Sequence, residues 1–273
     1  SVVGQTVLPE KWAIVSDGST DRTDEIIQDY ASRHAWIRYL RRPEHADRQF
    51  AAKAQAFAAG YAGASSIPHD VVGNLDADLS FEPDTMEFLL ARFSEDPGLG
   101  VAGAPFVEKA LGAYDYRFTN IEHVSGACQL FRRECFEAIG GYKPIQGGGI
   151  DWLAVTTARM MGWRTRTFTE RTVLHHRKIG TGGSTRLGFL YRQGVKEYYL
   201  GSHPVWQTFR ALYQMKHRPY FIGGMAIAAG YFISFVRGVQ KQASPDVIRF
   251  CRQEQIRRLG AAFGLRKRGG TLR

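Results

Sequence analysis

The strongest constraint on the fold is a pair of acids directly after a short apolar run. Residues 70–75 read Asp-Val-Val-Gly-Asn-Leu, and Asp76 and Asp78 follow. The run predicts a buried strand, which puts both carboxylates at the edge of an α/β sheet where ligands bind. Two acids this close repel each other, and a cation relieves the repulsion. Carboxylate oxygens suit Mg2+ or Mn2+, although Asp is also common in solvated turns.

Strands and helices are predicted to alternate through the N-terminal part of the chain. Runs rich in apolar, β-branched or aromatic residues predict strands at 12–16, 36–40, 71–76, 99–104, 127–131, 165–168 and 173–175. Helices are predicted after residue 20, at 50–62, after residue 83, at 133–139 and at 152–161. This alternation argues for one α/β domain, which we assign to residues 1–185. Residues 186–273 are assigned to a helical, basic region.

Three helix starts have recognisable residues. Ser19 or Thr20 is predicted to cap the helix after the first strand, because a hydroxyl accepts a bond from an unpaired helix N–H. Pro83 suits the first position of the following helix. Asp151, behind three consecutive glycines, is predicted to cap the helix at 152–161.

The positive charge is concentrated at the C-terminal end. The chain has 273 residues and a net charge of +10, with 44% hydrophobic residues, as in ordinary globular proteins. Residues 237–273 hold ten Lys and Arg against two acids, so they account for most of the excess. Such a tail binds anionic lipid or nucleic acid, or forms a solvated basic helix. The three cysteines have no zinc-site spacing, which favours a reducing compartment.

An apolar segment precedes this tail. Residues 219–236 contain no charged side chain, and as a helix they would be about 27 Å long, just short of the roughly 30 Å hydrocarbon core. Basic residues flank both ends, which disfavours a single span. We expect a segment that dips into or lies along the cytoplasmic leaflet of the cell membrane. A core helix packed on the catalytic domain is the other interpretation. In the membrane-bound arrangement, four arginines contact anionic head groups: Arg249, Arg252, Arg257 and Arg258.

Four segments together resemble family 2 glycosyltransferases, which are nucleotide-sugar enzymes with the GT-A fold. They are Val-Ser-Asp-Gly-Ser-Thr-Asp at 15–21, Asp-Ala-Asp at 76–78, Ser-Gly-Ala-Cys at 125–128 and Gly-Gly-Ile-Asp-Trp at 148–152. The resemblance covers residues 1 to about 185. It implies a Rossmann-like mixed sheet flanked by helices, followed by a helical membrane-associated tail. It also implies inverting transfer of a sugar from a nucleoside-diphosphate sugar to a hydroxyl of a sugar or lipid-linked acceptor. The expected setting is bacterial cell-surface polysaccharide or glycolipid synthesis, with no nucleic acid as partner.

The resemblance assigns roles to individual residues. Asp78 holds Mg2+ or Mn2+ against the diphosphate, and His176 completes the metal site. Asp151 is the catalytic base that takes the proton of the acceptor hydroxyl. The nucleotide-sugar is assigned to five residues: Asp17, Lys53, Asp76, Gly126 and Arg177.

Each of these residues also has a purely structural interpretation. Asp17 and Asp151 can serve only as helix caps, and Lys53 can be a solvated helix lysine. The His-Arg pair at 176–177 can belong to a basic surface loop.

The sequence departs from the family pattern at three places. Ser16 replaces an acid often found before Asp17, and Ile150 stands where the family often has Glu. The usual opening strand is absent, so we expect an N-terminally truncated domain with an unpaired edge or gap in its sheet. A nucleotidyltransferase and a catalytically silent nucleotide-sugar binding module at the membrane remain the alternative functions.

Overall fold

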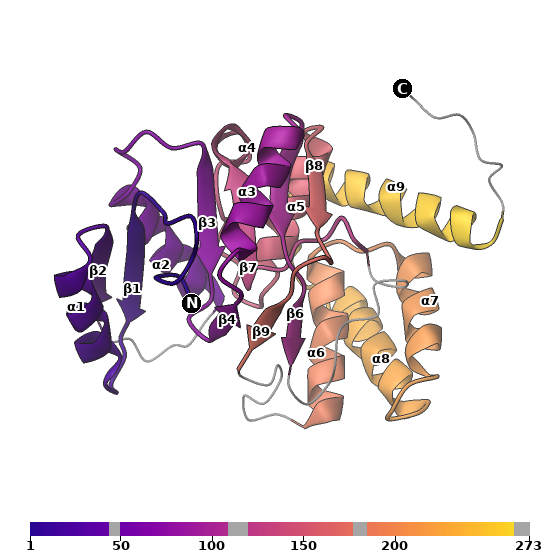
Figure 1. The fold of residues 1–273 in the computed structure, drawn as a ribbon. Helices are drawn as coiled ribbons and strands as arrows, with labels where there is room; N and C mark the ends of the chain where they lie inside the picture. The colour runs from indigo at the N-terminus through magenta and orange to yellow at the C-terminus, as the bar shows by residue number, and fades with distance from the viewer. Residues whose placement is uncertain (44–49, 109–119, 177–184, 265–273) are drawn as a thin grey trace. The chain divides into compact units, whose positions relative to one another are not determined.

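The computed structural model describes residues 1–43, 50–108, 120–176 and 185–264, and it divides into two compact units, residues 1–178 and 179–273 (Figure 1). The two units are described separately. The boundary predicted from the sequence, after residue 185, follows a stretch that lies outside the described residues and stays a prediction.

The N-terminal unit begins with a two-stranded parallel sheet. β1 (Trp12–Asp17) pairs with β2 (Ile37–Arg42), and α1 (Thr23–Arg33) connects them. α2 (Phe50–Ala62) packs on β1 at Gly60, where a Cβ would lie 3.1 Å from the Val15 side chain. Among the described strands, β1 and β2 pair only with each other, so the sheet is interrupted before the next strand.

The central sheet has four strands in the order β3-β7-β5-β8. These strands are β3 (Val71–Leu75), β7 (Cys128–Arg132), β5 (Leu99–Gly103) and β8 (Arg164–Thr167). β7 runs antiparallel to β3 and β5, whereas β5 and β8 are parallel. The mixed α/β architecture predicted from the sequence is therefore confirmed.

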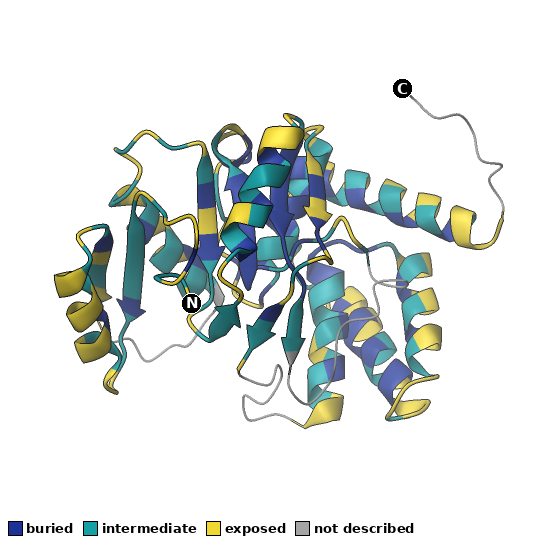
Figure 2. Cartoon of the chain, viewed as in Figure 1, coloured by how far each residue is buried: buried dark blue, intermediate teal, exposed yellow. Residues whose placement is uncertain are grey.

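Helices cover both faces of this sheet, and alternate residues of β5 and β7 contribute to the two cores. Val101 and Phe131 pack with α4 (Arg133–Ala138) and α5 (Ile150–Met160). Their neighbours Ala102 and Leu130 pack on the opposite face with α3 (Thr85–Glu95). β5 and β7 are buried on both faces, and such strands read as largely apolar runs, which explains why these two strands were predictable. Figure 2 shows the buried residues concentrated in these strands.

A three-stranded sheet lies beside the acid pair. β4 (Leu79–Phe81) is antiparallel to β9 (Val173–His175), and β9 is parallel to β6 (Phe106–Glu108). The register pairs Leu79 with His175. β4 and β6 were not predicted, because each has only three residues and no apolar run of its own.

Three predicted helix starts are wrong. α1 begins at Thr23 with Arg22 at its N-cap and no side-chain cap, so neither Ser19 nor Thr20 caps it. α3 begins at Thr85, two residues after Pro83.

The start of α5 is set by glycines. Gly148 and Gly149 take the left-handed φ values 92° and 99°, which suit glycine alone. Gly149 is the N-cap, so Asp151 lies inside the first turn and is not the N-cap residue of the helix. The carboxylate is thereby available for other contacts.

The C-terminal unit is helical. Its helices are α6 (Arg186–Tyr199), α7 (Pro204–Gln214), α8 (Ile222–Val236) and α9 (Pro245–Ala262). α6 and α8 meet backbone to backbone, since a Cβ at Gly194 or Gly230 would lie 2.0 Å from a carbonyl oxygen of the other helix. Within the described part of the chain, no helix combines the length and apolar character needed to cross a membrane.

Candidate active site

The acid pair lies where β3 ends. The Asp76 N–H donates to the Ala127 carbonyl (2.9 Å), which ties the pair to the segment that precedes β7. Lys53, on α2, forms an ion pair with Asp76 and donates to the Gly126 carbonyl (3.2 Å). Burial raises the pKa of Asp76, while the Lys53 ammonium opposes that effect.

The strand register brings a histidine to Asp78. His175 Nε2 lies 3.5 Å from Asp78 Oδ1. The His176 ring instead lies 2.9 Å from Ser80 Oγ, and the backbone N–H of His176 donates to the Asp78 carbonyl (2.9 Å). Successive residues of a strand point to opposite faces, so only one of the two imidazoles reaches the carboxylate. The structure places His175 there, and the His176 side chain elsewhere.

The donor set fits a hard divalent cation. Within the described residues, no group of three or more acids, histidines or cysteines is arranged to hold a metal ion by itself. Mg2+ and Mn2+ sites at phosphates need no such cage, because one or two carboxylates, waters and the phosphates complete the coordination. Asp78, with Asp76 one residue away and His175 beside it, supplies that kind of partial site.

Gly126 connects the acid pair to the predicted base. Its carbonyl accepts from Asn74 Nδ2 (2.6 Å) as well as from Lys53, and its N–H donates to Asp151 Oδ2 (3.1 Å). A Cβ at this position would lie 2.8 Å from the Asp151 Cβ, so only glycine fits. One residue therefore spans the distance between the Asp76–Lys53 pair and Asp151.

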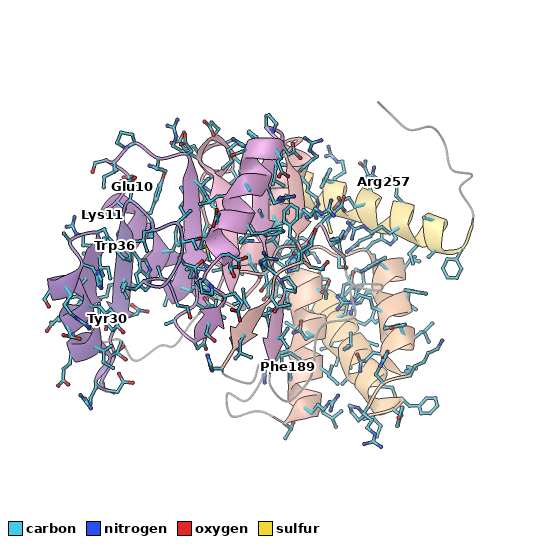
Figure 3. All side chains as sticks on the ribbon, in the orientation of Figure 1. Glu10, Lys11, Tyr30, Trp36, Phe189 and Arg257 are labelled. Carbon is cyan, nitrogen blue, oxygen red and sulfur yellow. The ribbon has the colours of Figure 1, made fainter. Side chains whose placement is uncertain are left out.

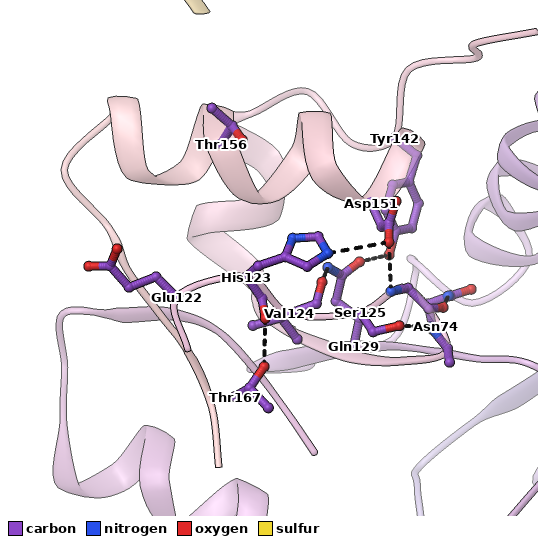
Figure 4. Close-up of polar contacts among 12 residues, drawn as sticks. Asn74, Glu122, His123, Val124, Ser125, Gln129, Tyr142, Asp151, Thr156 and Thr167 are labelled. Carbon is purple, nitrogen blue, oxygen red and sulfur yellow. Dashed lines mark hydrogen bonds and ion pairs between the residues drawn. The ribbon is translucent and has the colours of Figure 1, made fainter. Parts of the chain in front are cut away.

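A histidine, carried by a hydrogen-bonded segment, lies on the other side of Asp151. His123 Nε2 lies 4.0 Å from Asp151 Oδ2. Tyr142 donates to Gln129 Oε1, and Gln129 Nε2 donates to the Val124 carbonyl (2.9 Å), which fixes the segment that carries His123 (Figure 4). Burial raises the pKa of Tyr142 well above its usual value, so the phenol keeps its proton. The Asp151 side chain is 28% exposed and thus remains open to a substrate.

Asp17 belongs to a second cluster, on the β1–β2 sheet. Arg42 Nη1 donates to Asp17 Oδ1 (2.7 Å) and to the Ala52 carbonyl (3.3 Å). Ala52 precedes Lys53 on α2, so one turn of this helix contacts both the Asp17 and the Asp76 clusters. Asp17 is thus held by an arginine.

The structure thus brings together Asp76, Asp78, Lys53, Gly126 and Asp151. Arg177, predicted to bind phosphate, lies outside the described residues.

Four residues of the site were not predicted from the sequence: Arg42, Asn74, His123 and His175. His176 had been predicted in place of His175. Strand alternation was the signal for His175. The others depend on contacts between distant segments.

Comparison with known sequences supports the resemblance. Residues 1–117 match the family described as glycosyl transferase family 2. Chondroitin synthase of Pasteurella multocida (strain Pm70) and hyaluronan synthase of Pasteurella multocida are each 32% identical over 99 residues. That match covers 36% of this chain and 9% of each relative. The chain thus spans a small part of the curated relatives it matches.

Solved structures show the same fold. A mannosyltransferase from Pyrobaculum calidifontis, in complex with GDP-Man and Mn2+, has a TM-score of 0.53 at 18% identity, covering 97% of this chain and 75% of that one. GalNAc-T7 with UDP, GalNAc and Mn2+ has a TM-score of 0.54 at 15% identity, covering 97% of this chain and 54% of that one. Residues 1–117 therefore resemble glycosyl transferase family 2, and the chain has a mixed α/β, GT-A-like fold.

Proposed function

We propose that this chain transfers a sugar from a nucleoside-diphosphate sugar to a hydroxyl acceptor, with inversion. The observation that carries the proposal is the link through Gly126 between an acid pair at a strand end and a carboxylate on α5. The first group suits the diphosphate and its cation, and the second suits the acceptor hydroxyl. Transfer needs both at once.

The donor lies against the acid pair in this mechanism. Asp78, with Asp76 and His175 nearby, would hold Mg2+ or Mn2+, and the cation would supply positive charge to neutralise the leaving diphosphate. Lys53 holds Asp76 in place and adds a positive charge beside the phosphates. The Asp17–Arg42 pair, tied to the same turn of α2, is assigned to the nucleoside.

The acceptor lies against Asp151. This carboxylate takes the proton of the acceptor hydroxyl as its oxygen attacks the anomeric carbon. The Gly126 N–H fixes one carboxylate oxygen, and His123 flanks the same oxygen. The bond to the diphosphate breaks on the opposite face of the sugar, which inverts the configuration.

The biological setting and the acceptor are also part of the proposal. The two curated relatives are named as synthases of chondroitin and hyaluronan, and their source is a bacterium. We assign this chain to bacterial cell-surface polysaccharide or glycolipid synthesis on that basis. The acceptor is then a sugar chain or a lipid-linked sugar.

A nucleotide-sugar screen tests the function. Because a ligand that binds only the folded state raises stability by about 2.7 kcal/mol at a hundredfold excess over Kd, a matching UDP- or GDP-sugar with Mn2+ should raise the melting midpoint. The free sugar is the control and should leave the midpoint unchanged. Release of UDP or GDP on addition of acceptor then separates a transferase from a silent binding module. If no sugar nucleotide shifts the midpoint, the proposal is wrong.

The C-terminal unit is proposed to bind the cytoplasmic face of the membrane. α8 has no charged residue, and its inner face packs on α6 and α7. Its outer face, with the residues just before it, exposes large apolar side chains to 39–83%: Tyr220, Phe221, Ile222, Met225, Phe232, Ile233 and Val236. Exposed Lys216, Arg218 and Arg237 border this surface. An apolar strip with a basic border suits the interface of an anionic bilayer.

Flotation tests this second proposal. The wild-type chain should float with vesicles that contain phosphatidylglycerol. A Phe221→Ser, Met225→Ser, Val236→Ser variant should stay at the bottom of the gradient, because it loses apolar area that enters the interface. The matched control removes three exposed apolar side chains of the N-terminal unit, Leu8, Ile26 and Met161, and should still float. Equal loss in both variants, or no flotation of the wild type, would exclude the surface.

A further inference from the structure

A groove on the C-terminal unit has a composition unlike that of the apolar surface on α8. It has a volume of about 1460 Å3 and lies along α9, with His203 and the segment before α9 completing its wall. Four basic side chains line it: Lys241, Arg249, Arg252 and Arg257. No acid lines it. Figure 3 labels Arg257, which is exposed on α9.

The acids of α9 lie outside this groove. Asp246 Oδ1 is 3.6 Å from Arg249, and both side chains are more than 70% exposed, so solvent weakens the pair. Glu254 faces Arg258 at 4.0 Å. Arg258, expected from the sequence to share the anion-binding face, is therefore engaged elsewhere. The groove keeps a net positive charge.

Two of the four cations are fixed in position by neutral partners. Lys241 Nζ donates to the Tyr198 carbonyl (2.6 Å) and lies 3.0 Å from the centre of the Tyr198 ring. Arg252 Nε donates to the Gly201 carbonyl (2.9 Å). Burial, together with the nearby Arg252 charge, lowers the pKa of Lys241 to about 8. A carbonyl orients a cation without neutralising it, so the charges of Lys241 and Arg252 still repel each other. An anion in the groove would relieve that repulsion.

The rest of the wall is largely apolar. Pro245, Ile248 and Ile256 line the groove between the basic residues. Arginine forks match phosphate oxygens, whereas an inorganic ion would leave the apolar wall in water. The chemistry therefore favours a ligand that has both a phosphate and an apolar chain.

We propose that this groove binds a phosphate ester attached to an apolar chain. Arg249 and Arg257 hold the phosphate oxygens, Lys241 and Arg252 supply the fixed positive charge behind them, and Ile248 and Ile256 cover the chain. The site stands on the C-terminal unit alone and requires nothing of the catalytic proposal. The same chemistry occurs in a soluble lipid phosphate and in a phospholipid head group within a bilayer.

Calorimetric titration with geranyl monophosphate tests the site. We expect it to bind at least about tenfold more tightly than inorganic phosphate, since each tenfold step needs only about 1.4 kcal/mol. Arg249→Gln with Arg257→Gln should weaken binding about tenfold or more, because charge-assisted hydrogen bonds to the phosphate are lost. Both side chains are exposed, so folding should persist, and an unchanged melting midpoint would verify it. The matched control, Arg186→Gln with Arg192→Gln, removes two exposed charges of the same unit outside the groove. Its affinity should equal that of the wild type.

Three outcomes would overturn the proposal. Inorganic phosphate binding as tightly as geranyl monophosphate would remove the role of the apolar wall. If the control variant loses as much affinity for geranyl monophosphate, the attraction comes from the general positive charge of the unit and not from a specific site. Absence of binding to both geranyl monophosphate and phosphatidic acid vesicles would exclude the groove altogether. Binding to only one of these two confirms the chemistry and identifies the source of the phosphate.

Discussion

Asp151→Asn is expected to lower turnover by on the order of 100-fold or more, the usual scale for loss of a general base. An amide cannot take the proton of the acceptor hydroxyl. Its oxygen can still accept from the Gly126 N–H, so the local geometry should persist. Donor affinity should therefore stay close to that of the wild type. Measuring kcat by nucleotide release and donor Kd by calorimetry separates the two effects.

Glu122→Gln is the matched control for this variant. Glu122 lies next to His123, and its side chain points away from Asp151 (Figure 4). It should keep nearly normal turnover. If Asp151→Asn stays active and Glu122→Gln does not, the base is Glu122. Loss of donor binding in Asp151→Asn would instead make Asp151 a structural residue.

Asp78→Asn should abolish the metal-dependent part of donor binding. Supporting residues around a metal typically contribute 10–100-fold to its affinity, so loss of a direct ligand should cost on the order of 100-fold. Calorimetry with the UDP- or GDP-sugar that the screen identifies, with and without Mn2+, measures this directly. A chelator should reduce wild-type affinity to the level of the variant.

Asp70→Asn controls for the loss of a negative charge. Asp70 is exposed and directly precedes β3, at the end opposite the acid pair. It should keep both affinity and Mn2+ dependence. Unchanged wild-type affinity in chelator would exclude the metal site, whatever the variant does.

The sequence predicted those elements whose signal is local. The strands at 99–104 and 127–131 were visible because both faces of each are buried, which leaves a continuous apolar run. The strand at 173–175 was found at its observed bounds. β4 and β6 were missed because a three-residue strand is defined by its partner, β9, and partners are not visible in a linear pattern.

In the candidate site, too, the sequence predicted only the residues that a local motif marks. Asp76, Asp78 and Asp151 were singled out from motifs, and the structure joins Asp76 and Asp151 through Gly126. The choice between His175 and His176 depends on strand register, which the sequence leaves open. Asp151 was predicted to cap α5, but two left-handed glycines start the helix earlier. His123 approaches it from a distant segment, so no local pattern identifies that contact.

The glycine contacts between α6 and α8 determine how strongly the association of the two helices depends on water. Gly194 and Gly230 let the two backbones touch, so the pair is held by close van der Waals contact. Helices in lipid associate through this kind of small-residue contact, because hydrocarbon provides no hydrophobic driving force between them. A pair joined in this way does not depend on water for its cohesion. If the proposed membrane-binding surface of α8 enters lipid, we therefore expect the α6–α8 pair to keep the same geometry.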